Sequence, residues 1–126
     1  MDREGVFKFT DFLSYFMIFN CMYNLVDYQV ISLYIKLMQY EWDENKRLAN
    51  LVRHKVDFTD AVNFEWDTAL ETIDDRFDYG EERWVALGFI GTRLHVLVYT
   101  FRAAKIRIIS LRKATKRERL YYEKQT

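Results

Sequence analysis

The last third of the chain carries cations that suit the binding of phosphate. Arginines stand at positions 107, 112, 117 and 119, on both sides of a predicted junction between a strand and a helix. Ile106, Ile108 and Ile109 are β-branched and predict the strand. Thr115 and Glu118 have the spacing of a capping box, which predicts the start of the helix. A guanidinium stays charged and matches the geometry of phosphate, so this junction indicates a phosphate-binding surface, with a solvated basic helix face as the alternative.

Charge is balanced over the whole chain but is unevenly distributed along it. The 126 residues include 19 Lys and Arg and 19 Asp and Glu. Residues 93–126 contain ten of the cations and two of the carboxylates, a net charge of +8, whereas residues 38–92 contain six and thirteen, a net charge of −7. The basic part can bind a polyanion, and the acidic part can bind a basic partner or fold against the basic part. Cys21 is the one cysteine, which excludes an internal disulfide and suits a reducing cytoplasm.

The first 37 residues differ in composition from the rest. Residues 12–26 form an uncharged apolar run that is shorter than the ~20 residues a membrane-spanning helix needs. The start of the chain lacks the positive charge of a signal peptide. We interpret residues 1–37 as an apolar N-terminal extension from a misassigned start, and we predict that translation in effect begins at Met38. The alternatives are a helix that packs on the domain or its partner, and membrane association; no membrane contact is expected for residues 38–126.

From Met38 onwards the sequence predicts one α+β domain, residues 38–126, in which helices gather on one side of an antiparallel sheet. Asp43 is expected to cap the first helix and Thr59 the second. A hairpin is predicted at residues 90–92, which include Gly91. The predicted order is β-α-α-β-β-β-β-α, with strands at 40–42, 69–73, 83–89, 93–100 and 105–111, and helices at 44–54, 60–64 and after Thr115.

Two hydrophobic patterns predict how these elements face the core. In the first helix, Leu48, Leu51 and Val52 have the spacing of a buried stripe. In the strand at residues 93–100, side chains alternate between two faces. One set is Leu94, Val96 and Val98, and the other is Arg93, His95, Leu97 and Tyr99.

Three ordered blocks of this sequence resemble the BrnT family of toxins. The first comprises Tyr40-Glu41-Trp42-Asp43-Glu44-Asn45-Lys46, Asn50-Leu51, His54 and Val56-Asp57-Phe58. The second comprises Asp75-Arg76, Asp78-Tyr79-Gly80-Glu81-Glu82-Arg83-Trp84 and Gly88. The third comprises Val98-Tyr99-Thr100, Ile106-Arg107-Ile108-Ile109-Ser110, Arg112-Lys113-Ala114, Glu118-Arg119 and Tyr122. The resemblance covers residues 38–123 and excludes the first 37.

This resemblance implies a toxin of a type II toxin–antitoxin system, with a fold similar to RelE-type ribonucleases. It also implies neutralisation by a small DNA-binding antitoxin, BrnA. The chain departs from the family pattern at several positions that glycine, an acidic residue or proline often occupies. These positions are Lys55, Phe101, Ala103-Ala104 and Glu65-Trp66-Asp67-Thr68.

The implied activity assigns roles to particular residues. A metal-independent ribonuclease directs the RNA 2′-hydroxyl at the neighbouring phosphate, which needs a base, an acid and cations for the charge on the phosphoryl oxygens. Arg83, Arg107 and Arg112 are the candidate cations. Each also has a structural interpretation as half of an ion pair, with Asp75 or Asp78 for Arg83 and Glu118 for Arg112. His54 is the candidate for acid–base catalysis, since an ordinary imidazole pKa of about 6.5 suits proton transfer; a helix C-cap is its alternative role.

Further residues are candidates for binding RNA. Lys113, Arg117 and Arg119 can contact phosphates, and the rings of Tyr79, Trp84 and Tyr122 can stack on bases, although core packing is their alternative role. We expect no cofactor and no metal, because the aspartates at positions 74, 75 and 78 lack the further ligand of a calcium loop.

Together these features predict a cytoplasmic toxin that cleaves RNA and inhibits translation and growth. Its expected partners are the RNA substrate and a cognate BrnA-like antitoxin, and promoter DNA is reached only through that antitoxin. The alternative is a non-catalytic module that uses the same basic face to bind nucleic acid or an acidic segment of a protein.

Overall fold

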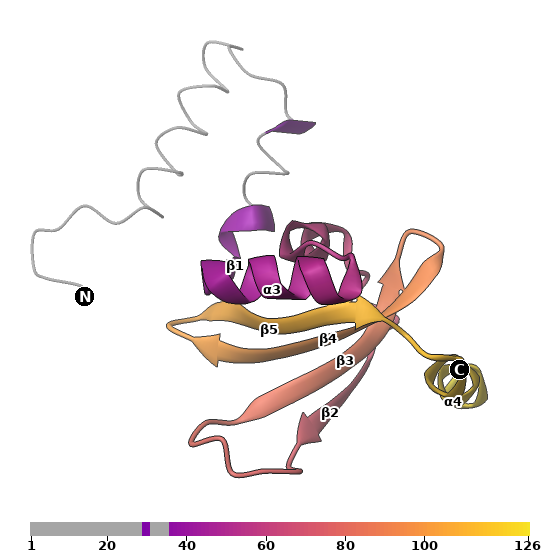
Figure 1. Cartoon of the computed structure of the whole chain (residues 1–126). Helices are drawn as coiled ribbons and strands as arrows, with labels where there is room; N and C mark the ends of the chain where they lie inside the picture. The colour runs from indigo at the N-terminus through magenta and orange to yellow at the C-terminus, as the bar shows by residue number, and fades with distance from the viewer. Residues whose placement is uncertain (1–28, 31–35) are drawn as a thin grey trace, which may run out of the picture. The chain divides into compact units, whose positions relative to one another are not determined.

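The computed structural model describes residues 29–30 and 36–126 (Figure 1). The chain divides into two compact units, residues 1–38 and 39–126, and the second contains all the elements described below. The predicted extension at residues 1–37 lies almost entirely outside the described residues. Among the helices of the described ranges, none has the length and apolar character needed to cross a membrane.

A five-stranded sheet forms the centre of the second unit, with the strand order β1-β5-β4-β3-β2 (Figure 1). The strands are β1 (Tyr40–Trp42), β2 (Leu70–Asp74), β3 (Arg83–Ile90), β4 (Arg93–Arg102) and β5 (Lys105–Lys113). Strands β2 to β5 pair antiparallel, whereas β1 runs parallel to β5. The α+β class is confirmed, but the sheet is mixed rather than purely antiparallel. The parallel pair is possible because the rest of the domain connects β1 to β5, and parallel strands need such a long crossover.

The sheet has two faces, each with its own apolar cluster. On the face that we call the first, Leu97 and Tyr99 pack with residues of η1, the 3-10 helix Phe58–Asn63, beside helix α3 (Glu44–His54). On the second face, Leu94 and Val96 pack with Tyr122 of helix α4 (Lys116–Gln125). The predicted alternation along β4 is therefore confirmed. The helices do not all lie on one side, because α4 packs on the face opposite to η1.

Side-chain caps fix the starts of the helices. Asp43 accepts hydrogen bonds from the backbone N–H groups of Asn45 and Lys46, which confirms it as the cap of α3. The capping box between Thr115 and Glu118 at the start of α4 is also confirmed. The short helix η1 is capped by Asp57 rather than by the predicted Thr59, because the Asp57 carboxylate accepts from the Thr59 N–H.

Helix α3 presents its polar side to the sheet, which the apolar pattern did not predict. Leu48 is 47 % exposed and Val52 is 73 % exposed, so the predicted buried stripe is wrong for these two residues, whereas Leu51 is half-buried. The buried residue of α3 is Asn50. Its amide nitrogen donates to the carbonyls of Val56 (3.0 Å) and Leu111 (2.7 Å), and its amide oxygen accepts from the Leu111 N–H (3.2 Å).

These hydrogen bonds complete the edge of the sheet. Strand β1 ends at Trp42, opposite Ile108, so the backbone of Leu111 lies beyond the last pair of the parallel ladder. The Asn50 side chain takes the place that the next residue of a neighbouring strand would occupy. It therefore fixes α3 against β5 through polar bonds, which buried backbone groups require.

We expect Asn50→Leu to destabilise the domain by at least about 3 kcal/mol, because three buried backbone groups would each lose a partner at about 1–3 kcal/mol apiece. The midpoint of urea unfolding measures this change. Leu48→Ala, on the exposed side of the same helix, is the control and should change stability by less than about 0.5 kcal/mol. Equal shifts in the two variants would show that the Asn50 bonds do not hold α3.

Candidate active site

A bulge in β5 places two of the predicted arginines on one face of the sheet. Along β4 the partners skip from Ser110, opposite Val98, to Ile108, opposite Tyr99, so Ile109 is an extra residue. Arg107 consequently lies opposite Thr100, and Arg112 lies opposite Val96. Without the bulge, residues five positions apart on a strand would point to opposite faces. With it, both arginines share the second face.

Arg83 joins this group from β3. It precedes Trp84, which packs on the first face, so it belongs to the second face. Its guanidinium lies 3.9 Å from the centre of the Tyr79 ring and 3.4 Å from a Glu81 oxygen. Two inter-strand steps separate β3 from β5, which puts the backbones of Arg83 and Arg107 about 10 Å apart.

The three arginines differ in how firmly carboxylates hold them. Arg112 makes two short bonds to Glu118, 2.7 and 2.9 Å long, which confirms the expected pair. These bonds hold the pKa of Glu118 well below its usual value, at about 2, so Glu118 stays charged at physiological pH. Arg107 has a single 3.5 Å contact with Glu41. The expected partners of Arg83, Asp75 and Asp78, are replaced by Glu81.

His54 ends α3 and is half-buried. Burial is the main cause that lowers the pKa of His54, and the positive charges of Arg53 and Arg112 lower this pKa further. The lowered pKa favours the neutral imidazole, the state in which it can accept a proton. His54 also lines a cleft of about 260 Å³ between α3 and β5, together with Lys46, Ala49, Asn50, Arg53, Ile109 and Ser110.

The three aromatic candidates lie in packed surroundings. Tyr122 is buried, with its hydroxyl donating to the carbonyl of Thr68 and its ring against Phe89. Trp84 packs against the first-face cluster. Tyr79 is half-buried under Arg83. Tyr122 therefore has the position of a core-packing residue, whereas Trp84 and Tyr79 are half-buried and stay predictions as base-stacking residues.

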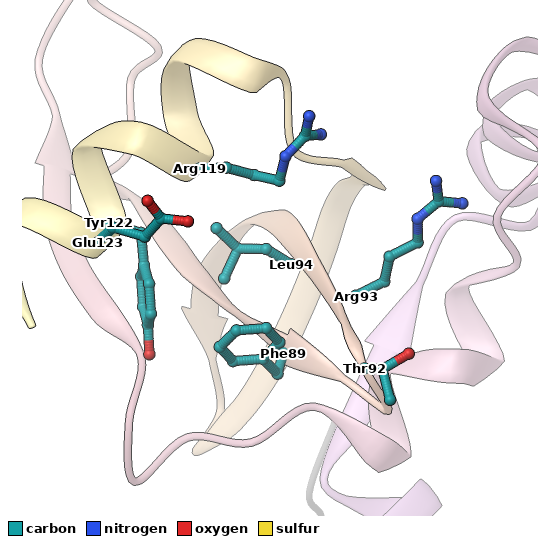
Figure 2. A pocket seen from close by; sticks show the side chains of 7 residues that line it. All are labelled: Phe89, Thr92, Arg93, Leu94, Arg119, Tyr122 and Glu123. Atoms are coloured by element: carbon teal, nitrogen blue, oxygen red, sulfur yellow. The ribbon is translucent and has the colours of Figure 1, made fainter.

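The basic candidates lie near the end of β5 and on α4, where Lys113, Arg117 and Arg119 are exposed. Arg119 lines a cavity of about 400 Å³ between α4 and the β3–β4 hairpin, and Figure 2 shows it beside Leu94 with Arg93 on the hairpin. Arg93 was not predicted as a site residue. The sequence shows that Arg93 follows a hairpin turn. It does not show that α4 lies beside that turn, so Arg93 could not be predicted as a neighbour of Arg119.

A comparison with protein families identifies the family to which the chain belongs. The model of the family "Ribonuclease toxin, BrnT, of type II toxin-antitoxin system" matches residues 42–118. This range includes His54, Arg83, Arg107 and Arg112 and covers more than half of the chain. A comparison with curated proteins found no match. The chain therefore belongs to the BrnT family of ribonuclease toxins from type II toxin–antitoxin systems.

Proposed function

We propose that this chain is an active, metal-independent ribonuclease of the cytoplasm that inhibits translation and growth, with its activity in residues 38–126. One observation carries the proposal: the bulge in β5 brings Arg107 and Arg112 onto the same face as Arg83, and Arg112 is near enough to His54 for its charge to lower the pKa of that imidazole. The family description supports a ribonuclease.

In the proposed reaction, the side chains divide the chemistry between them. Arg83 and Arg107 bind the RNA backbone and stabilise the charge that grows on the phosphoryl oxygens. Neutral His54 takes the proton of the 2′-hydroxyl, whose oxygen attacks the neighbouring phosphorus. The bond from phosphorus to the 5′-oxygen breaks, and that oxygen takes up a proton from the protonated imidazole or from water. Arg112 acts on His54 through its charge, because Glu118 already occupies its guanidinium.

This proposal predicts cleavage without metal. The purified full chain, incubated with RNA in excess EDTA, should yield fragments that end in a 2′,3′-cyclic phosphate. Intact RNA, or cleavage that begins only after a divalent cation is added, would overturn the proposal. RNA that is retained but not cut, with an affinity that falls as salt rises, would instead indicate the non-catalytic binding module.

The family also implies an antitoxin partner. We propose that this partner is a BrnA-like DNA-binding protein that covers the arginines of the second face, so that promoter DNA is reached only through it. Helix α4 supports a protein contact here, because Leu120 and Tyr121 are 49 % and 51 % exposed. They line a shared surface hollow with Lys116, Arg117 and Lys124, which suits a partner segment with apolar and acidic side chains.

A further inference from the structure

Helix α3 carries two cations beside the polar residue that it buries against the sheet. Lys46, Asn50 and Arg53 stand at positions i, i+4 and i+7, a spacing that often carries the apolar contacts of a helix. All three line the cleft against β5; Asn50 is buried, whereas Lys46 and Arg53 are exposed to solvent. Polar residues at helix positions that usually carry apolar contacts reduce the apolar area that the helix can bury. Such positions mark a candidate functional surface.

Within the part of the chain that the structure describes, Lys46 and Arg53 form no ion pair with a carboxylate. Arg47, the neighbour of Lys46 on the same helix, contacts Glu44 at 2.5 Å and Asp57 at 2.9 Å. Among the ion pairs of the described residues, none includes Lys46 or Arg53. The lining adds His54 and the hydroxyl of Ser110 but no carboxylate. A cleft with this lining favours an anion, and two cations that line the same cleft suit a phosphate group.

We propose that the cleft between α3 and β5 binds a phosphodiester of the RNA strand that flanks the one to be cleaved, with Lys46 and Arg53 as its ligands. This inference rests on the proposed function and adds a second subsite to it. The RNA would cross the edge of β5 from the second face into the cleft. His54 marks the crossing point, since it lines the cleft and is close enough to Arg112 for that charge to lower its pKa.

The test measures RNA binding separately from cleavage. The probe is a fluorescein-labelled 12-nucleotide 2′-O-methyl RNA, which lacks the attacking hydroxyl, and fluorescence anisotropy gives its affinity over a range of salt concentrations. Each phosphate contact with a single strand contributes about 0.7 to the slope of log affinity against log salt. The double variant Lys46→Gln with Arg53→Gln should therefore lower the slope by about 1.4.

Matched variants show whether a lower slope comes from the loss of a phosphate site in the cleft or from the loss of positive charge anywhere on the protein. Lys116→Gln with Lys124→Gln removes the same charge from the exposed side of α4 and should leave the slope unchanged. Arg53→Lys keeps the charge and should also keep the slope. In cleavage assays Lys46→Gln, which leaves the charges that act on His54 in place, should cut a dinucleotide, which occupies only the cleaved position, as fast as the wild type, and should cut the unmodified 12-nucleotide RNA more slowly.

The outcomes separate this inference from the proposed function. An unchanged slope in the cleft variant, or an equal fall in the α4 variant, overturns the subsite even if the protein cleaves RNA. A slope that falls as expected in a protein that never cleaves RNA supports the cleft as a phosphate site and refutes the ribonuclease. Loss of antitoxin binding with an unchanged RNA slope assigns the cleft to the protein partner and overturns the subsite. Equal urea midpoints show that the variants are folded.

Discussion

Arg107→Gln should lower the rate of RNA cleavage about 10²–10³-fold, the usual effect of removing one group that stabilises a developing oxyanion. Cells that stop growing when the wild-type chain is induced should therefore continue to grow with this variant. Arg107 is the arginine of the second face that can turn most readily to a phosphate, because its one carboxylate contact, with Glu41, is 3.5 Å long. Arg112, by contrast, is held by two short bonds to Glu118.

The controls for this prediction concern charge, geometry and the partner. Arg102→Gln removes an exposed cation at the end of β4 and should still arrest growth. Arg107→Lys keeps the charge but loses the fork that matches phosphate, so its cleavage rate should be intermediate. Co-expression of the antitoxin should restore growth of the wild-type strain. Growth arrest by Arg107→Gln at the wild-type protein level would remove Arg107 from the active site.

His54→Gln should lower kcat about 10²–10⁴-fold, the range found when a general acid–base group is lost. The wild-type pH profile should rise as the imidazole loses its proton and should then level off. Because burial, Arg53 and Arg112 all lower the pKa of His54, its midpoint should lie below the ordinary value of about 6.5, and activity should persist into mildly acidic solution.

A second variant tests the cause of this shift. Arg53→Gln removes one of the two positive charges that lower the His54 pKa, so the acidic midpoint of the pH profile should move upwards. The midpoint is read from kcat measured between about pH 5 and 8. A His54→Gln variant that keeps the rate and the pH profile of the wild type would show that another group transfers the proton.

Local signals made the elements predictable. The caps at Asp43 and Thr115 depend on contacts within three residues, so the sequence contains all the information they need. The alternation along β4 is equally local, and it correctly separated Leu97 from Leu94 and Val96. The four main strands were found for the same reason, with ends that differ by one or two residues.

The arrangement of the site depended on contacts between distant residues. The Ile109 bulge follows from the pairing of β5 with β4, and nothing in the order of the residues marks it. The orientation of α3 depends on the bonds of Asn50 to Leu111, 61 positions away. The hydroxyl of the buried Tyr122 donates a hydrogen bond to the carbonyl of Thr68, which is 54 positions away in the sequence. The chemistry of the candidate residues was therefore predictable, whereas their grouping was not.

Among the described residues, left-handed backbone angles occur at three positions that do not carry glycine. Lys55, Ala103 and Ala104 have φ angles of 60°, 49° and 65°, the left-handed region that favours glycine. The resemblance described above leads us to expect a glycine at Lys55 and in the turn at Ala103-Ala104. Each substitution for glycine there costs about 1 kcal/mol. None of the three positions contributes to the arginine group.

The extra residue in β5 makes the length of this strand as important as its composition. Four residues separate Arg107 from Arg112, and the sharing of one face depends on that even number together with the bulge at Ile109. An exchange of side chain at Ile109 can leave the count intact. Deletion of Ile109 would remove the bulge together with its extra residue, so Arg107 and Arg112 would stand four positions apart on a regular strand and would still share the second face. A further residue inserted between them would instead turn Arg112 away from Arg107 and break its pair with Glu118. The bulge and the spacing of the two arginines must therefore change together.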